Sequence, residues 1–92
     1  MRSGTGMLFI YKASGERIFW MKRMRIPIDM LWIRKGQIVA IEQQVPPPST
    51  LMNDKSLKRY GYGVVADMVL ELPAGYARQY SIHVGQSIRL IP

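Results

Sequence analysis

Three ionisable side chains lie among apolar residues in this sequence, and they are the first candidates for chemistry. Lys22, Asp29 and Glu71 have neighbours such as Trp20 and Leu70. If such groups converge in a partly dry cleft, burial and mutual charge shift their pKa values. Two carboxyl groups in that setting can act as an acid and a base. The candidate ligand-binding residues are therefore Trp20, Lys22, Asp29 and Glu71.

The same charges also have a structural interpretation. Lys22 can pair with a carboxylate, and all three groups can fix strand ends without contacting a ligand, because structural ion pairs shift pKa values too. This interpretation is favoured, so no catalytic residue is assigned, and we expect a non-catalytic domain that binds a small ligand or a protein through a cleft near these residues. The alternative from another class is a small hydrolase or transferase that uses Asp29 and Glu71.

A third hypothesis rests on charge. Thirteen Lys and Arg residues against six Asp and Glu residues give a net charge of +7. With Trp20 and Trp32 between them, clustered basic residues would suit a stacking surface for single-stranded nucleic acid. The competing interpretation is a solvated face with both tryptophans in the core. The candidate anion-binding residues are Arg17, Arg23, Arg25, Arg34 and Lys35.

Several kinds of site are excluded or disfavoured by residue type. Without cysteine, the chain has no disulfide, no thiolate zinc site and no cysteine nucleophile. His83 is the only histidine and falls in a predicted turn, and no glycine-rich phosphate motif occurs. The seven methionines lie mostly among strand residues, where they fill gaps in a core. We therefore expect no metal and no cofactor.

The elements that must position these residues are mostly strands, because apolar residues recur with a period of two. Turn residues predict hairpins at Ser14–Gly15 and Lys35–Gly36. We expect Val39 and Ile41 to share one face of their strand. The expected strands cover residues 7–11, 17–22, 29–34, 37–43, 64–72 and 87–91.

Two further segments complete the pattern. Residues 44–63 contain three consecutive prolines and little periodicity, so we expect a long loop there, either a flap or an interaction segment. Pro73 suits the first position of a short helix, in which Tyr76 and Tyr80 lie one turn apart. In the strand before it, Met68, Leu70 and Leu72 share one face, whereas Asp67, Val69 and Glu71 share the other.

Length and composition then set the fold class. Ninety-two residues with 48% hydrophobic content suffice for one core, so we expect a single domain over residues 1–92. The fold is predicted to be mostly β, a small barrel-like or curled antiparallel or mixed sheet with one short helix. No apolar run reaches the roughly 18 residues of a membrane span. Residues 1–6 also lack the apolar segment of a signal peptide.

Six short motifs, in one order, resemble a known family. They are Gly6–Phe9 (GMLF), Phe19–Lys22 (FWMK), Ile26–Leu31 (IPIDML), Val45–Pro47 (VPP), Val69–Gly75 (VLELPAG) and Val84–Gly85. Together they resemble the DUF192 (UPF0127) family across residues 6–92. The resemblance implies a compact, β-rich, barrel-like prokaryotic domain with many exported or envelope-associated relatives. It implies no biochemical function and leaves the compartment of this chain open.

The sequence departs from the family pattern at three places. The resemblance implies an additional strand ahead of Gly6, so the domain is N-terminally short and the edge beside residues 7–11 should be unpaired. Unpaired edges recruit strands, so we expect a homo-oligomer. The family's cysteine-bearing loop reads Val45–Ser49 here, and its closing Gly-Asp reads Gly85–Gln86. Cysteine- or carboxylate-based chemistry at those two places is therefore not expected.

Overall fold

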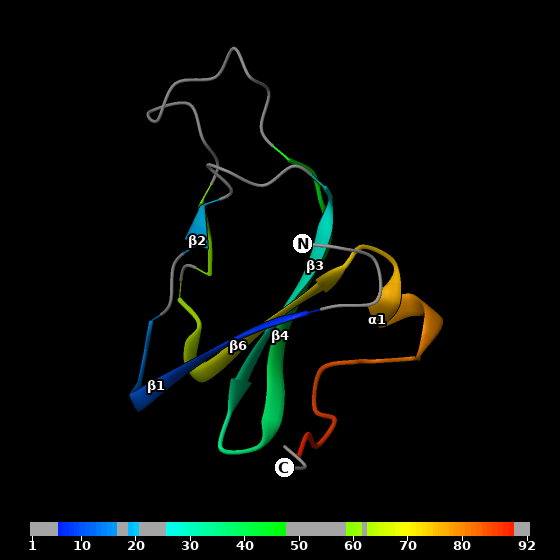
Figure 1. Cartoon of the computed structure of the whole chain (residues 1–92). Coiled ribbons are helices and arrows are strands. Elements are labelled where there is room, and N and C mark those ends of the chain that lie inside the picture. The colour runs from blue at the N-terminus through cyan, green and yellow to red at the C-terminus, as the bar shows by residue number, and fades with distance from the viewer. Residues whose placement is uncertain (1–5, 17–18, 21–25, 48–58, 62, 90–92) are drawn as a thin grey trace.

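A computed structural model describes residues 6–16, 19–20, 26–47, 59–61 and 63–89. Strands dominate it, and they cross in a twisted sheet with the helix to one side (Figure 1). The elements are β1 (Met7–Glu16), β2 (Phe19–Trp20), β3 (Ile28–Arg34), β4 (Gln37–Val45), β5 (Arg59–Tyr60), β6 (Val65–Pro73) and α1 (Tyr76–Gln79).

The main sheet has four antiparallel strands in the order β1-β6-β3-β4, and β2 pairs separately with β5. The mostly-β prediction with one short helix is confirmed, but the sheet stays open and does not close into a barrel. Among the described pairs, β1 pairs with β6, so the predicted hairpin between residues 7–11 and 17–22 is not found there. Pairing with β6 brings residues more than 50 positions apart together, which local turn signals do not reveal.

β1 is longer than predicted because the turn signal at Ser14–Gly15 marks a bulge inside the strand. Ile10 lies opposite Met68, and Gly15 lies opposite Ala66. The β1 residues 11–14 therefore face the single β6 residue Asp67. A bulge of this kind bends the strand and interrupts its ladder.

The β3–β4 hairpin at Lys35–Gly36 is confirmed. Both residues have positive φ, 49° and 78°, as a type I′ turn requires. Further along β4, Ala40 pairs with Trp32 and Ile38 with Ile33, which leaves Val39 as an extra residue. This bulge breaks the alternation, so Val39 is exposed and the prediction that it shares a face with Ile41 is wrong.

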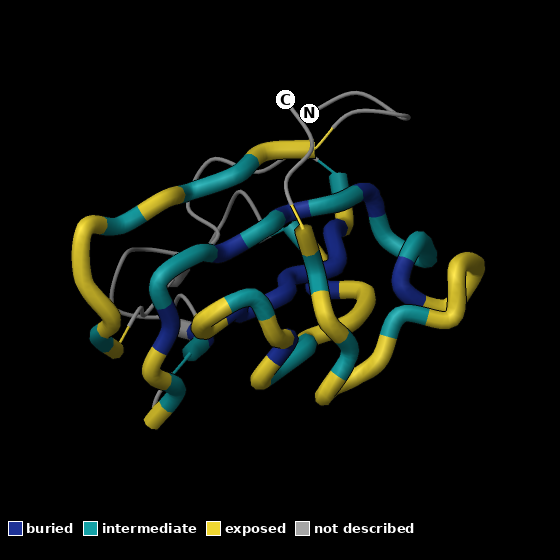
Figure 2. Tube along the Cα trace, turned by 90° about the horizontal axis from the view of Figure 1, so that it is seen from below, coloured by how far each residue is buried: buried dark blue, intermediate teal, exposed yellow. Residues whose placement is uncertain are grey.

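Apolar side chains form a cluster on each face of the sheet. One contains Ile28, Met30, Trp32 and Val69, with Phe9 and Tyr11 packed against them. The other contains Leu31, Ile33 and Ile38, with Met68, Leu70, Leu72, Ile82 and Ile88 packed against them. Because both faces are covered, β3 is buried from Ile28 to Ile33, and the buried positions gather at the centre of the molecule (Figure 2). The core interpretation of Trp32 is confirmed.

The C-terminal part follows the edge of β4 without forming the expected strand. Over the described residues, pairing there consists of one bridge, Gln37 with Ser87. The backbone N–H of Ile38 donates to the Gln86 carbonyl at 2.9 Å, and that of Ile88 donates to the Gly36 carbonyl at 2.7 Å. The prediction of a strand over residues 87–91 is therefore wrong for residues 87–89, and residues 90–91 lie outside the described part of the chain.

α1 begins at Tyr76 rather than at Pro73, because Pro73 is the last residue of β6 and Gly75, with φ of 95°, makes the turn. The expected contact between Tyr76 and Tyr80 is confirmed, with ring centroids 5.7 Å apart in an edge-on arrangement. His83 is exposed, as predicted. Within the described residues, no helix has the length and apolar character needed to cross a membrane.

Candidate functional site

Asp29 lies at the start of the central strand β3, and its side chain is fully buried. Its Oδ1 accepts a hydrogen bond from the backbone N–H of Gln44 at 2.8 Å. Its Oδ2 accepts from the N–H of Gly75 at 3.1 Å and from the N–H of Ala77 at 2.8 Å. Hydrogen bonds to an ionised acceptor are short and strong, so these donors stabilise the carboxylate.

The three donors come from two other parts of the chain, so Asp29 joins them to β3. Gln44 has a positive φ of 53° and lies where β4 carries an extra residue, between the pairs of Ile28 with Val45 and Met30 with Glu42. Gly75 and Ala77 form the turn into α1. Asp29 therefore holds a bulge and a helix start in place, which matches the structural interpretation of this residue.

Glu71 lies in the central strand β6 and is 5% exposed. It is opposite Met30 on one side and Met7 on the other. Burial in this apolar setting raises the pKa of its carboxyl group above the ordinary value of 4.5. A buried carboxyl group of this kind is a candidate for ligand contact or for proton transfer.

The register shows that Asp29 and Glu71 do not meet. Asp29 pairs with Leu72, whose side chain packs in the cluster on the α1 side of the sheet. Glu71 pairs with Met30, which belongs to the cluster on the other face. Directly opposed residues point to the same face and consecutive residues to opposite faces. The two carboxyl groups are therefore on opposite faces, and a shared acid–base cleft is wrong.

The remaining sequence-predicted residues are only partly placed. Arg34 and Lys35 are exposed at the β3–β4 turn. Trp20 belongs to β2, but its side chain lies outside the described part of the chain. Of the expected 44–63 loop, Val45 belongs to β4, and residues 59–60 form β5. The structure does not describe the other predicted site residues or most of the loop, namely Arg17, Lys22, Arg23, Arg25 and residues 48–58 and 62.

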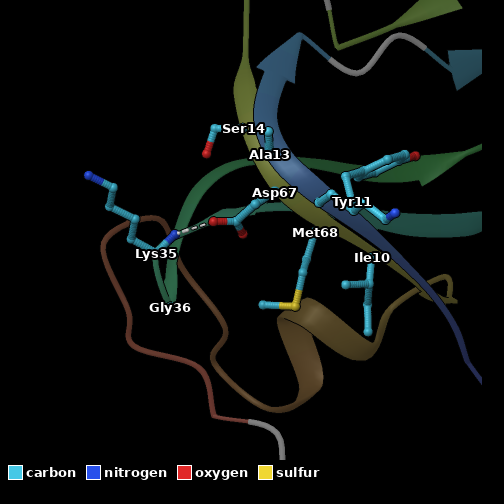
Figure 3. Close-up of a pocket in the computed structure, with 9 residues that line it drawn as sticks. Ile10, Tyr11, Ala13, Ser14, Lys35, Gly36, Asp67 and Met68 are labelled. Carbon is cyan, nitrogen blue, oxygen red and sulfur yellow. Dashed lines mark hydrogen bonds between the residues drawn. The ribbon is translucent and has the colours of Figure 1, made fainter.

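The sequence interpretation missed an open groove of about 360 Å³ at the other end of the sheet. Its lining includes Ile10, Ser14 and Asp67 (Figure 3). The Oδ2 of Asp67 accepts a hydrogen bond from the backbone N–H of Lys35 at 2.9 Å. Its Oδ1 is buried and has no partner among the described residues. The signal in the sequence that could have indicated this groove is Ser14–Gly15, because it marks the bulge in β1 and bulges are common beside functional sites.

The described residues contain no group of three or more His, Cys, Asp or Glu that could hold a metal ion. The carboxylate of Asp29 already accepts hydrogen bonds from backbone N–H groups. Asp67 and Glu71 lie at separate positions along β6. The arrangement offers one engaged carboxylate, one buried carboxyl group with a raised pKa, and one half-occupied carboxylate beside a groove.

An open antiparallel sheet with a short helix after its central strand defines a small β domain without a recognisable catalytic constellation in the described part. The chain belongs to the DUF192 family, whose model, described as "Uncharacterized ACR", matches residues 1–90. No curated protein matches the chain.

Two solved structures are similar to this chain. A candidate transcription regulator from Sinorhizobium meliloti 1021 is 28% identical with a TM-score of 0.76, and the match covers 95% of this chain and 63% of that one. A protein of unknown function from Novosphingobium aromaticivorans DSM 12444 is 21% identical with a TM-score of 0.76, and the match covers 98% and 60%. The second likeness shows the fold alone. The chain spans less than two thirds of the length of either protein.

Proposed function

We propose that this chain is a non-catalytic binding domain. The observation that carries the proposal is the placement of Asp29 and Glu71 on opposite faces of the sheet. A general acid and a general base must both reach the reacting atoms of one substrate. These two carboxyl groups cannot do so, and Asp29 is already engaged by three backbone donors.

Glu71 stays in the proposed binding set. Its carboxyl group is buried on the face opposite α1, and this burial disfavours the charged form and raises its pKa. A ligand that donates a hydrogen bond or brings a positive charge would relieve this cost. Trp20 and Lys22 also belong to the proposed ligand-binding set, from the sequence.

Native mass spectrometry of the purified full chain tests this proposal. We expect a non-covalent adduct that is retained under native conditions and lost on denaturation. Separately, hydrolysis of p-nitrophenyl acetate and p-nitrophenyl phosphate should not exceed the background rate. Hydrolysis that Glu71→Gln abolishes, while that variant melts no lower than the parent, would overturn the proposal in favour of a hydrolase.

A nucleic-acid-associated role is the second candidate. Two observations favour it: the net charge of +7, with Arg34 and Lys35 exposed at one turn, and the description of the Sinorhizobium relative as a candidate transcription regulator. Binding that rests on phosphate contacts weakens steeply with salt. We expect weak, sequence-independent binding of a labelled oligonucleotide near physiological salt. A sub-micromolar, sequence-selective complex there would make this the leading function.

A further inference from the structure

The groove exists because β1 leaves β6 for a few residues. Ile10 still pairs with Met68, but the next pair is Gly15 with Ala66, so residues 11–14 bend away from Asp67. The bent part of β1 forms one wall and the Lys35–Gly36 turn forms the other (Figure 3). Its volume of about 360 Å³ is within the range of small-ligand sites, roughly 300–1,000 Å³.

One half of the groove is polar and contains a carboxylate oxygen that accepts no hydrogen bond from the described residues. Lys35 N–H occupies Oδ2 of Asp67, whereas Oδ1 is buried and has no partner among the described residues. A buried acceptor without a donor costs free energy. The Ser14 hydroxyl points toward the groove (Figure 3). Oδ1 is buried as the carboxylate stands, so a ligand reaches it only when the carboxylate turns about its terminal torsion, which is broad for Asp.

The other half of the groove is apolar. Ile10 and Met68 pair across the two strands, and their side chains lie on the same side (Figure 3). Because Met68 follows Asp67 directly in β6, the two side chains leave the strand on opposite faces, and the groove is lined from both faces at this end of the sheet. Ile10 is 66% exposed, which is unusual for an isoleucine in a strand, whereas Met68 packs on the core cluster behind it. An apolar group placed on Ile10 would remove part of this surface from water.

The rim of the groove is positively charged. Lys12 and Lys35 line it and are exposed, on a chain with a net charge of +7. The Lys35 side chain extends into solvent (Figure 3). Exposed side chains of this kind change rotamer within nanoseconds, so both ammonium groups can close on an anion at the rim.

Taken together, these features select one ligand chemistry. We propose that the groove binds an apolar α-amino acid unit with a free carboxylate, either as the C-terminal residue of a peptide or as a free amino acid. Its N–H donates to Asp67 Oδ1, its carboxylate meets the lysines and the Ser14 hydroxyl, and its side chain packs on Ile10 and Met68. This inference rests on the proposed binding function and names the ligand class.

NMR titration of the labelled full chain tests it with three probes: N-acetyl-Ala-Leu with a free carboxylate, the same dipeptide as its C-terminal amide, and free leucine. We expect the acid dipeptide to shift the amide signals of Ser14, Gly36 and Met68, with an affinity in about the millimolar range because a dipeptide makes few contacts with an open groove. The amide probe should bind about tenfold more weakly, which corresponds to the loss of one charge-assisted contact. Free leucine distinguishes the two sources of the ligand.

Two pairs of variants distinguish binding in the groove from a general effect of surface charge or surface hydrophobicity. Lys12→Glu should weaken the acid dipeptide about tenfold. Arg78→Glu makes the same charge change on exposed α1, at the Asp29 end, and should change affinity less than twofold. Likewise, Ile10→Ser should weaken binding severalfold, whereas Val84→Ser, at a residue 58% exposed elsewhere, should not. All four positions are exposed, so folding should be kept.

The outcomes are distinct. The inference is supported if the acid dipeptide or leucine binds, if both groove variants weaken this binding, and if both control variants leave it unchanged. It is overturned if neither acid probe shifts the groove amides, if the amide probe binds equally well, or if Lys12→Glu and Arg78→Glu act alike. If native mass spectrometry still finds an adduct of other chemistry, the proposed binding function stands and only this ligand assignment fails.

Discussion

The two ends of the central strands each carry an aspartate that accepts backbone hydrogen bonds, but the two carboxylates differ in how fully they are satisfied. Asp29 is completely buried and receives three N–H donors from the β4 bulge and the turn into α1. Asp67 is partly exposed, accepts one hydrogen bond from the Lys35 N–H, and keeps a buried Oδ1 that has no partner among the described residues.

This difference separates a structural carboxylate from one that is available to a ligand. At the Asp29 end, three backbone donors fill most of the roughly four acceptor positions of the carboxylate, and the side chain is fully buried, so a ligand would have to open the packed structure to reach it. At the Asp67 end, a ligand could fill an empty acceptor position. A ligand is therefore more easily accommodated beside Asp67 at the β3–β4 turn than at Asp29.

The largest expected effect on stability comes from replacing each of these two aspartates, one at a time, with uncharged asparagine. Asp29→Asn places an amide NH₂ against backbone N–H donors, so we expect a loss of about 3 kcal/mol in the free energy of unfolding. Asp67→Asn is the matched control and should cost about 1 kcal/mol or less, because its amide oxygen can still accept from Lys35 N–H. Urea unfolding of both variants measures the difference. Equal losses would show that the two ends do not differ as described.

A smaller, pH-dependent effect is expected at Glu71. Its folded-state pKa is raised by burial, so the unfolded chain ionises first and stability falls as pH rises from the ordinary value of 4.5 through the raised pKa. Glu71→Gln removes this loss. As the pH rises from about 4 to about 7, the melting temperature of the variant should therefore increase relative to that of the parent.

Thermal melts at a series of pH values check the Glu71 prediction. Gln at this position also removes the possibility of an ion pair with a lysine, which is what the sequence interpretation favoured. A melting temperature that falls relative to the parent as pH rises would indicate that Glu71 is stabilised as a carboxylate by a charged partner.

The smallest expected effect on stability concerns assembly. β1 is the outermost strand of the described sheet on that side, and Met7 and Ile10 are 49% and 66% exposed. We expect a homodimer or higher oligomer at micromolar concentration, and Met7→Lys, at an edge residue outside the groove, should shift it toward monomer without changing the melting temperature of the protomer by more than a few degrees. Light scattering of parent and variant decides, and a monomeric parent would contradict the prediction.

The features that sequence reasoning predicted are local ones. The Lys35–Gly36 hairpin follows from the turn residues, and the shared face of Met68, Leu70 and Leu72 follows from the pleat of one strand. The pairing of β1 with β6 joins residues far apart in the chain, and nothing near Met7 indicates its partner. Bulges also defeat the pattern, because the extra residue at Val39 reverses the faces that strict alternation assigns.

The candidate site shows the same limit. Burial of Asp29 could be suspected from its apolar neighbours, but its donors lie 15, 46 and 48 residues further along the chain. Placing Asp29 and Glu71 on opposite faces needs the register of β3 on β6, which is a property of the assembled sheet. The groove at Asp67 depends on a nonlocal bulge and was therefore missed.

The three hydrogen bonds of Asp29 also predict how the molecule opens. Gln44, Gly75 and Ala77 lie at a bulge, a turn and a helix start, which are ordinarily the places that exchange their amide hydrogens early through local fluctuation. One buried carboxylate holds all three, so none of them can open without exposing that charge to an unsatisfied interior. Their amides should exchange together, at the slow rate of the central strands, so that these three connecting positions and the sheet core form one cooperative unit.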